Sequence, residues 1–292
     1  MRNILLYTDT PQIGGAELQM FLLAKFLNKQ AFKPILACSN YPQLNKWCEN
    51  FEKENIKVIR MQVKHKHDPR HYFQLKKIIK ENKINLVHAH VWNPASCRYA
   101  FSAAKGMKIP IITTEHDPFK LSLLKDVIKK ENLKIVSKII TVSENNAKIL
   151  KELYPEQKTK IQVIHNGIDI DWWHSQLLRF TDEERHEIKE HLFMAKEDTL
   201  IITTIGELHE RKGQKYLIEA MPEVIKDFPN VKLVIIGDGI ERQNLDKLIE
   251  KLGLKENVII LGKQKGIPHL LKASNIFVSP SVREAFGFVL TE

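Results

Sequence analysis

Hydrophobic residues in the first part of the chain fall into short runs, and between these runs they recur every three or four positions. Short apolar runs are typical of strands buried on both faces, whereas the wider spacing is typical of helices with one apolar stripe. Ala16–Asn28 and Asp68–Lys83 show the helical spacing most clearly. The runs predict strands at Ile4–Tyr7, Pro34–Cys38, Lys57–Met61, Asn85–Ala89, Ile109–Thr114, Lys138–Ser143 and Ile161–Ile164.

The alternation pauses over residues 169–198, where Thr181–Phe193 is highly charged, and then starts again. Strands alternating with helices indicate crossover units and a parallel sheet covered on both faces. We therefore expect an α/β fold of two tandem doubly wound, Rossmann-like domains at residues 1–170 and 199–292, joined by a linker at 171–198. The second domain is expected to contain the strands Leu200–Ile205, Lys232–Ile236, Val258–Leu261 and Ile276–Ser279 and the helices Gln214–Phe228, Ile240–Leu252 and Ile267–Ala273.

Doubly wound sheets bind their ligands beyond the carboxyl ends of the strands. Two such domains that face one another form a cleft, and we expect the ligand site in it. The segments that directly follow strands are therefore the first place to look for chemistry.

The composition of the 292 residues is that of an ordinary globular protein, with 43% hydrophobic and 27% charged residues. It excludes a largely disordered, collagen-like or coiled-coil chain. No apolar run approaches the roughly 20 residues that span a bilayer, and Ile4–Tyr7 is too short for a signal-peptide core, so we expect a cytoplasmic location. Cys38, Cys48 and Cys97 are far apart, and their spacing indicates neither a disulfide framework nor a zinc knuckle.

Positive charge is concentrated in the first domain. Residues 1–170 hold 28 Lys and Arg against 15 Asp and Glu, a balance of +13, whereas residues 171–292 hold 17 against 20. The excess favours an acidic partner such as nucleic acid, an anionic membrane surface or a phosphorylated substrate, or it is only a solvated lysine-rich surface. Tyr72 and Phe73 lie on the apolar stripe of a helix, which argues against base stacking, so we expect no nucleic-acid partner.

Two features that follow strands of the first domain are candidates for chemistry. Gly14 and Gly15 open a helix after the first strand, where free backbone N–H groups suit an anion or sugar hydroxyls, although a plain tight turn explains them equally well. The dinucleotide fingerprint G-x-G-x-x-G is absent at this turn. His116 directly follows another strand. A metal site could be imagined at His88 and His90 with His65 and His67, but no carboxylate or cysteine at helical ligand spacing completes it, so we expect no metal.

The second domain offers two cations and two carboxylates. Arg211 and Lys212 stand before a helix, where a phosphate would be held by adjacent positive charges and the helix N-terminus. Glu284 and Glu292 are separated by eight residues in the last segment and could flank one ligand across a turn, or both could be solvated.

Taken together, the order and spacing of these residues resemble glycosyltransferase family 4, retaining enzymes of the GT-B fold that use nucleotide-sugar donors. The last segment, with its two glutamates, is the most diagnostic. The resemblance covers the whole chain and rests on Gly14-Gly15-Ala16-Glu17, Leu86-Val87-His88-Ala89-His90, Thr141-Val142-Ser143, His165-Asn166-Gly167-Ile168-Asp169, Gly237-Asp238-Gly239 and Glu284 with Glu292.

The resemblance implies a role for each matching residue and makes residues 1–170 the acceptor side and 199–292 the donor side. His116 and Glu284 are the implied catalytic residues, both at the transferred sugar. The implied donor-binding residues are Gly14, Gly15 and Lys212 at the diphosphate, with Arg211 as a second cation, Phe286 and Gly287 through their backbone N–H groups, and Glu292 at the ribose. No metal cofactor is implied, because cationic side chains and helix termini replace its charge.

The chain departs from the family pattern in two places. Glu207 stands where many relatives carry an Arg, and a carboxylate cannot replace that Arg beside a diphosphate. We expect Glu207 to pair with Arg211. The chain also ends at Glu292, about one turn into a helix expected to begin at Phe286, so we expect a C-terminally truncated enzyme with an incomplete second domain.

The expected function is therefore the retaining transfer of a hexosyl group from a nucleotide-sugar donor to the hydroxyl of a sugar or lipid-linked acceptor, in cell-envelope polysaccharide or glycolipid synthesis. Peripheral contact with an anionic membrane, at the inner face of the cell membrane, is part of this expectation. The alternative is a non-catalytic fragment that binds a nucleotide-sugar or a partner protein.

Overall fold

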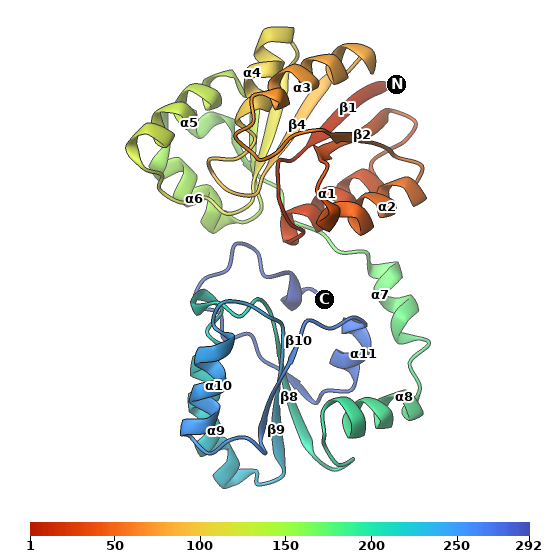
Figure 1. Cartoon of the computed structure of the whole chain (residues 1–292), viewed down its shortest axis with the longest axis vertical. Helices are drawn as coiled ribbons and strands as arrows, with labels where there is room; N and C mark the ends of the chain where they lie inside the picture. The colour runs from red at the N-terminus through yellow and green to blue at the C-terminus, as the bar shows by residue number, and fades with distance from the viewer. The chain divides into compact units, whose positions relative to one another are not determined.

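The computed structural model describes residues 1–292 and divides after Gly167 into two α/β units, Met1–Gly167 and Ile168–Glu292 (Figure 1). The segment at 171–198, expected to be a linker, belongs to the second unit.

The first unit is built on one seven-stranded sheet in which every neighbouring pair of strands is parallel. Its strand order is β3-β2-β1-β4-β5-β6-β7, so the order reverses between β1 and β4. A reversal of this kind leaves a crevice at the carboxyl ends of the two strands. The strands are β1 (Arg2–Tyr7), β2 (Phe32–Ser39), β3 (Lys57–Met61), β4 (Leu86–Val91), β5 (Ile111–Glu115), β6 (Lys138–Thr141) and β7 (Ile161–Val163).

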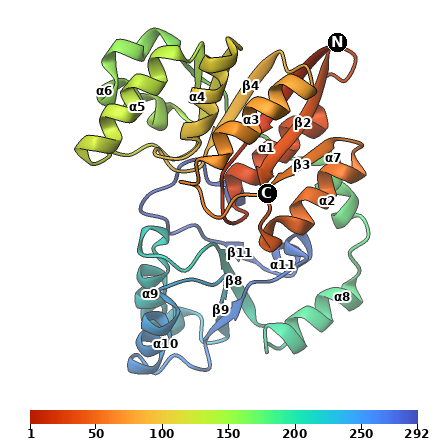
Figure 2. The same ribbon diagram turned by 45° about the horizontal axis from the view of Figure 1, so that its top comes forward.

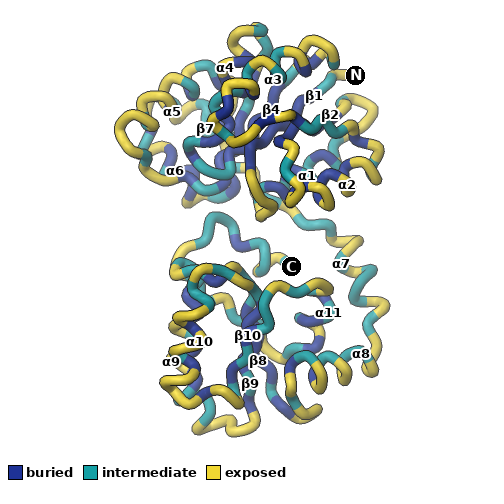
Figure 3. The backbone as a smooth tube through the Cα atoms, in the orientation of Figure 1, coloured by how far each residue is buried: buried dark blue, intermediate teal, exposed yellow.

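Helices cover both faces of this sheet. Alternate residues of β1 enter two separate cores: Ile4 and Leu6 pack with α1 and α2, whereas Leu5 and Tyr7 lie in the core shared with α3 and α4. The burial colours show the result, with buried strands and helices that expose their outer faces (Figure 3). The helices are α1 (Gly15–Phe26), α2 (Asn45–Lys53), α3 (Arg70–Glu81), α4 (Arg98–Met107), α5 (Leu123–Ile135) and α6 (Glu144–Leu153).

The second unit has a four-stranded parallel sheet in the order β10-β9-β8-β11. Helices α9 and α10 lie together on one side of it and α11 lies on the other, as both ribbon views show (Figures 1 and 2). The strands are β8 (Leu200–Ile205), β9 (Val231–Ile236), β10 (Val258–Gly262) and β11 (Ile276–Phe277), and these helices are α9 (Gln214–Asp227), α10 (Arg242–Lys251) and α11 (Ile267–Lys272).

The segment at 171–198 is largely helical, with α7 (Ile170–Leu177), α8 (Asp182–Glu187) and a π-helical turn at Ile188–Leu192. Thr181 begins α8 by a reciprocal cap, in which its hydroxyl accepts from the Glu184 N–H at 3.2 Å and the Glu184 carboxylate accepts from the Thr181 N–H at 3.0 Å. Phe193 is fully buried in the core beside α11. Most of the charge run that marks this segment in the sequence is therefore solvated, whereas Lys189 is buried.

The structure confirms the predicted α/β fold of two doubly wound sheets, and each predicted strand is present. Strand β11 ends two residues earlier than expected, close to Pro280, which has no N–H to donate to a neighbouring strand. The helix expected from Phe286 is wrong: the segment forms only a 3-10 turn at Phe288–Leu290. Five residues follow Gly287, and a first helical turn fixes several residues for very few hydrogen bonds.

Candidate active site

In the first unit, His116 lies directly after β5 and is paired with a histidine of the neighbouring strand β4. The two strands are in parallel register, with Val91 opposite Glu115, which brings their carboxyl ends to one edge. There His90 Nδ1 lies 3.2 Å from His116 Nε2, and the two rings stack with centroids 5.5 Å apart. The Asn146 side-chain amide of α6 donates to the His116 carbonyl at 3.0 Å. His116 is therefore held from two elements.

Burial keeps this histidine cluster neutral. It lowers the pKa of His116 to about 3 and that of His88 to about 4, and it also lowers the pKa of His90. His88 Nε2 lies 2.8 Å from the Thr114 hydroxyl, and the His90 Nε2 atom is buried without a hydrogen-bond partner. A neutral His116 can exchange hydrogen bonds with a substrate hydroxyl, but it cannot supply a positive charge at neutral pH.

A buried carboxylate that the sequence analysis missed, Asp9, ties the loop after β1 to the loop after β4. The Trp92 indole N–H donates to Asp9 Oδ1 at 2.9 Å, and the Cys97 backbone N–H donates to Oδ2 at 2.8 Å. Cys97 precedes α4 with a left-handed φ of 59°, which is uncommon for a residue other than glycine. Asp9 thus fixes the strained start of α4 at the switch point of the sheet. Its only sequence signal is a carboxylate two residues after a buried strand.

Gly14 and Gly15 open α1 as predicted, but their environment already contains a carboxylate. Glu17 is buried, and its Oε2 accepts from the Gly14 N–H at 2.9 Å. Burial raises the pKa of Glu17. The Gly14 N–H therefore has an internal acceptor, which any anion bound at this helix start would have to replace.

In the second unit, the structure brings Lys212 and Glu284 together. Lys212 belongs to a 3-10 turn at Glu210–Lys212 after β8, and its ammonium forms an ion pair with Glu284 Oε1. The Ser281 hydroxyl donates to the same Glu284 oxygen at 2.7 Å. The side chains of Lys212 and Glu284 are 13% and 23% exposed, so the pair is partly shielded from water.

Two backbone contacts hold these segments in place. Gly213 has a φ of 70°, and a Cβ built there would lie 2.1 Å from the Pro280 carbonyl oxygen, so no other residue fits without a shift. The Val282 N–H donates to the Arg211 carbonyl at 3.0 Å. The turn that carries Lys212 and the tail that carries Glu284 are therefore packed backbone to backbone.

Glu207 and Arg211 form the ion pair expected from the sequence, with Arg211 Nη2 3.1 Å from Glu207 Oε2. The Gln214 amide donates to the Glu207 carbonyl at 2.9 Å and fixes the end of β8. Arg211 and Lys212, the two predicted phosphate-binding cations, thus each have a carboxylate partner.

The Gly-Asp-Gly turn after β9 supports the same loop. A Cβ at Gly237 would lie 1.8 Å from the Gly206 carbonyl oxygen, and one at Gly239 would lie 2.4 Å from the Leu208 carbonyl oxygen. The Leu208 N–H donates to the Asp238 carbonyl at 3.1 Å. These glycines allow the turn to pack against the segment that leads to Lys212.

The predicted residues at the end of the chain are less closely organised. Gly287 has a left-handed φ of 84°, and the ring of Phe286 lies edge-on to Phe288 with centroids 5.2 Å apart. Burial raises the pKa of Glu292, whose backbone N–H donates to the Phe288 carbonyl at 3.1 Å. The Glu284 Cγ lies 3.8 Å from a Cβ built at Gly287, so this turn adjoins the Lys212–Glu284 pair.

No cluster of three or more His, Cys, Asp or Glu side chains has the arrangement of a metal site. None of the helices has the length and apolar character that crossing a bilayer requires.

Comparison with known proteins decides the family. The model of the family described as "Glycosyltransferase Family 4" matches residues 13–172, more than half of the chain. The chain belongs to glycosyltransferase family 4. The remaining part matches a second model, "Glycosyl transferases group 1", over residues 185–292. In this member of family 4, the second model covers the Lys212–Glu284 pair.

Several curated proteins are similar in sequence. An uncharacterized glycosyltransferase of Methanocaldococcus jannaschii is 34% identical over 53% of this chain and 36% of its own length. UDP-Gal:alpha-D-GlcNAc-diphosphoundecaprenol alpha-1,3-galactosyltransferase of Escherichia coli is 26% identical over 77% of this chain and 59% of its own. The family 4 chain spans between 36% and 62% of the length of the first four such relatives.

Solved structures share the fold. Anabaena Alr3699/HepE in complex with UDP and glucose superposes with a TM-score of 0.81 at 20% identity, over 99% of this chain and 77% of its own. A glycosyltransferase from Rickettsia africae superposes with a TM-score of 0.80 at 24% identity, over 97% and 73%. These likenesses confirm the expected GT-B class of fold for the family 4 chain.

Proposed function

We propose that this protein transfers a hexosyl group from a UDP-sugar to an acceptor hydroxyl with retention of configuration. The observation that carries the proposal is the ion pair between Lys212 and Glu284, which joins a cation and a carboxylate at the carboxyl edge of the second sheet. A nucleotide-sugar needs both: a cation for its diphosphate and an acceptor for its sugar hydroxyls. The UDP and glucose held by the HepE structure support a UDP-sugar as donor.

In this proposal the donor replaces each partner of the ion pair. The Lys212 ammonium turns to the diphosphate, and the Glu284 carboxylate accepts hydrogen bonds from the hydroxyls of the transferred sugar. Arg211 supplies a second positive charge once the phosphate competes with Glu207. The Phe286 and Gly287 N–H groups complete the donor contacts, with Glu292 at the ribose and Gly14 and Gly15 at the diphosphate.

The transfer itself exchanges one bond for another at the anomeric carbon. The bond to the diphosphate oxygen breaks, the acceptor oxygen bonds to the anomeric carbon from the same face, and the acceptor proton passes to the leaving diphosphate. Negative charge grows on that diphosphate, and Lys212 is placed to stabilise it. No step requires a metal ion.

His116 is proposed to act as a hydrogen-bonding group at the transferred sugar. Because burial lowers its pKa to about 3, the imidazole is neutral at physiological pH. It therefore accepts or donates a single hydrogen bond to a hydroxyl and does not act as a cationic acid. His90 fixes the orientation of its ring through the 3.2 Å contact.

The proposed acceptor is a sugar or lipid-linked molecule of cell-envelope polysaccharide or glycolipid synthesis, met at the inner face of the cell membrane. The printed name of the Escherichia coli relative describes transfer to a sugar on diphosphoundecaprenol, which supports a lipid-linked acceptor. The +13 balance of residues 1–170 supports contact with an anionic surface.

A second candidate function is a module that binds a nucleotide-sugar or a partner protein without turnover. The pairing of both Arg211 and Lys212 with carboxylates favours it, because these contacts compete with a diphosphate.

Titration and turnover separate the two functions. UDP binding is measured by calorimetry for the wild type, Lys212→Ala and the control Lys226→Ala, which removes an exposed lysine of α9. We expect Lys212→Ala to weaken UDP binding by at least about tenfold and Lys226→Ala to leave it unchanged, since a charge-assisted hydrogen bond contributes about 1.5–3 kcal/mol. Release of UDP from UDP-sugars in the presence of acceptor establishes transfer, whereas binding without release supports the module. Unchanged UDP affinity in Lys212→Ala contradicts the assigned donor site.

A further inference from the structure

Two cysteines of the first unit meet inside it. Cys38 lies on β2 and Cys48 on α2, and their sulfur atoms are 3.6 Å apart. Both are free thiols in the core that α1 and α2 form on one face of the sheet, with exposed fractions of 0% and 3%. One thiol therefore donates a weak S–H hydrogen bond to the other. The proposed transfer does not use this pair.

The surroundings make Cys48 the more acidic of the two thiols. The hydrogen bond with Cys38 lowers the pKa of the Cys48 thiol; burial opposes this effect, and the positive charge of Arg60 reinforces it. The same hydrogen bond, together with burial, raises the pKa of Cys38. Because the thiolate is the reactive form of cysteine, Cys48 is the nucleophile of the pair, and Cys38 is the neutral thiol beside it.

Arg60 of β3 is fixed beside the thiol pair by the loop between β2 and α2. Its Nε atom donates to the Ser39 carbonyl at 3.3 Å, and its Nη2 atom donates to the Tyr41 carbonyl at 2.7 Å. Its Nη1 atom donates to the side chain of Asn45, in the first turn of α2, at 3.1 Å. Three hydrogen bonds thus keep the positive charge in place.

A bond between the two sulfur atoms requires only a short approach. An S–S bond is about 2.03–2.05 Å long, so the atoms of Cys38 and Cys48 must close by about 1.5 Å. The two thiols are in direct contact, and each sulfur moves by rotation about a single Cα–Cβ bond. No other side chain has to leave the space between them.

We propose that Cys38 and Cys48 are a redox site, which a small hydroperoxide converts to a reversible disulfide that restrains the loop between β2 and α2. The exposed fraction of 3% at Cys48 favours hydrogen peroxide, a molecule little larger than water, over a bulky disulfide as the oxidant. This site is independent of the donor chemistry in the second unit.

The oxidation takes place in two balanced steps. The Cys48 thiolate attacks one oxygen of hydrogen peroxide, the O–O bond breaks, and the other oxygen leaves as hydroxide and takes up the proton that the thiol had released. The Cys38 sulfur then attacks the sulfur of this sulfenic acid, the S–O bond breaks, and the departing hydroxide takes the Cys38 proton. Two thiols lose two electrons and two protons, and one peroxide becomes two waters.

The disulfide closes the segment 38–48, which contains a 3-10 turn at Pro42–Leu44 and the start of α2. Trp47, the neighbour of Cys48, donates from its indole N–H to the Glu17 carbonyl in the first turn of α1 at 2.9 Å. A bond that fixes Cys48 therefore also holds α2 against α1. Oxidation should reduce the freedom of this loop and helix.

The test treats the folded full chain with a small excess of hydrogen peroxide and then counts its thiols in urea. We expect the free thiols to fall from three to one, and dithiothreitol to restore three. Trypsin cuts after Lys46, between the two cysteines, so the disulfide should appear in the mass spectrum as a linked pair of peptides. The mass of the pair should be two hydrogen atoms below the sum of the separate peptides.

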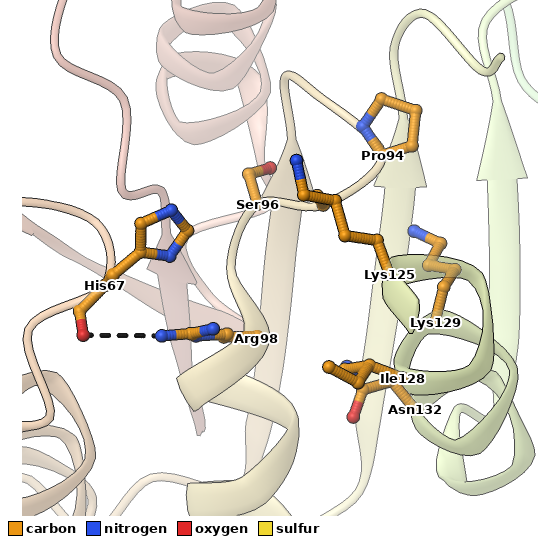
Figure 4. Close-up of a pocket in the computed structure, with 9 residues that line it drawn as sticks. His67, Pro94, Ser96, Arg98, Lys125, Ile128, Lys129 and Asn132 are labelled. Atoms are coloured by element: carbon orange, nitrogen blue, oxygen red, sulfur yellow. Dashed lines mark hydrogen bonds between the residues drawn. The ribbon is translucent and has the colours of Figure 1, made fainter. Parts of the chain in front are cut away.

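Cys97 is the internal control. It is also buried, but its sulfur donates to the His90 carbonyl at 3.3 Å and not to a second thiol. It lies between Ser96 and Arg98, whose side chains line a small cavity at the start of α4 (Figure 4). Burial raises the pKa of Cys97. We therefore expect its thiol to stay reduced under the conditions that link the other two.

Single variants separate the two steps of the oxidation. In Cys38→Ala no thiol is left to displace the oxygen, so a sulfenic acid should accumulate at Cys48 and be trapped by dimedone when the protein is unfolded in urea. In Cys48→Ala the remaining Cys38 should stay a thiol. Circular dichroism establishes that each variant is folded, and the linked peptides of the wild type test the proposal without them.

Hydrogen exchange tests the restraint. In the oxidised protein the amides of residues 40–53 should exchange several-fold more slowly than in the reduced protein, because the cross-link opposes local opening. The amides of α9, in the second unit, should exchange alike in both and serve as the control.

Three outcomes overturn the inference. Survival of all three thiols in peroxide that oxidises free cysteine means that the pair is not a redox site. Addition of oxygen to Cys48 in the wild type without a linked peptide means that Cys38 does not react with it. Linked peptides with unchanged exchange over residues 40–53 mean that the disulfide forms but does not restrain the loop.

Discussion

Lys212 and Glu284 are 72 positions apart in the sequence, yet their charged groups meet as an ion pair at the carboxyl edge of the second sheet. Neither charge is fully solvated, so each would be poorly compensated without the other. A nucleotide-sugar that takes the place of this contact supplies a partner to both at once. The charges of Lys212 and Glu284 balance one another, and each residue can be tested separately.

Replacement of Glu284 by Gln should change the binding of the diphosphate and the binding of the sugar in opposite directions. In this variant Lys212 has no carboxylate that competes with the diphosphate. An ion pair at this partial exposure contributes about 1 kcal/mol, so its loss should let UDP bind about fivefold more tightly. The advantage of a UDP-sugar over UDP should shrink, because the sugar hydroxyls lose a charged acceptor. Calorimetric titrations with UDP and UDP-glucose measure both effects. Unaltered UDP affinity would mean that the ion pair does not compete with the diphosphate.

Replacement of Glu207 by Gln should release Arg211. We expect UDP to bind about two- to fivefold more tightly at low ionic strength, with a smaller gain at high salt because the pair is partly exposed. Glu219→Gln is the matched control, since Glu219 also pairs with a lysine one turn away on an exposed helix surface. A gain of equal size in both variants would reflect only the change in net charge.

The buried histidines should make the stability of the first unit depend on pH. His116 and His88 are neutral in the folded state, with pKa values of about 3 and about 4, whereas an unfolded histidine titrates near pH 6.5. Below about pH 6.5 the unfolded chain binds more protons than the folded chain, so stability falls as the pH is lowered. Each histidine should remove about 2 kcal/mol between about pH 7 and pH 5.

Urea unfolding at a series of pH values tests this expectation. The free energy of unfolding should fall less between neutral and acidic pH in His116→Asn than in the wild type. The difference should be about the 2 kcal/mol that one buried histidine contributes. An unchanged slope would mean that the pKa of His116 is the same in the folded and the unfolded protein.

Gly213 and Gly253 provide a direct comparison of strain and steric conflict. Their φ angles are 70° and 69°, but a Cβ at Gly253 meets nothing within 4 Å, whereas one at Gly213 meets the Pro280 carbonyl. Alanine at either site costs about 1–2 kcal/mol for the left-handed backbone. Only Gly213→Ala should also weaken UDP binding, because the tail with Glu284 must move. Equal UDP affinities in the two variants would show that this packing does not organise the donor site.

The pattern of apolar runs predicts the sheets well, since parallel strands buried on both faces leave a strong local signature. The Glu207–Arg211 pair could also be predicted, because its members are four residues apart. Asp9 could not be found this way, because its partners Trp92 and Cys97 are distant in the sequence and meet it only when the sheet forms.

Other features depend on context that a sequence pattern does not carry. The role of Glu17 at the start of α1 follows from its burial and not from its position alone. In the charged segment before β8, Thr181 and Glu184 have the spacing of a helix cap. The run of charged residues that follows masks the apolar spacing by which a helix is normally predicted. The exposed apolar surface of α5 fits an ordinary amphipathic spacing, and only the packed unit shows that Leu123 and Leu124 are left uncovered.

The close approach of Gly213 to the Pro280 carbonyl has a consequence for local unfolding. Since the two segments pack backbone to backbone, one cannot separate from the other without breaking the hydrogen bond from the Val282 N–H to the Arg211 carbonyl. Opening of the tail and loss of the Lys212–Glu284 contact are then a single cooperative event. The rate of hydrogen exchange at the Val282 amide therefore measures how often the Lys212–Glu284 contact opens. A bound nucleotide should slow that exchange.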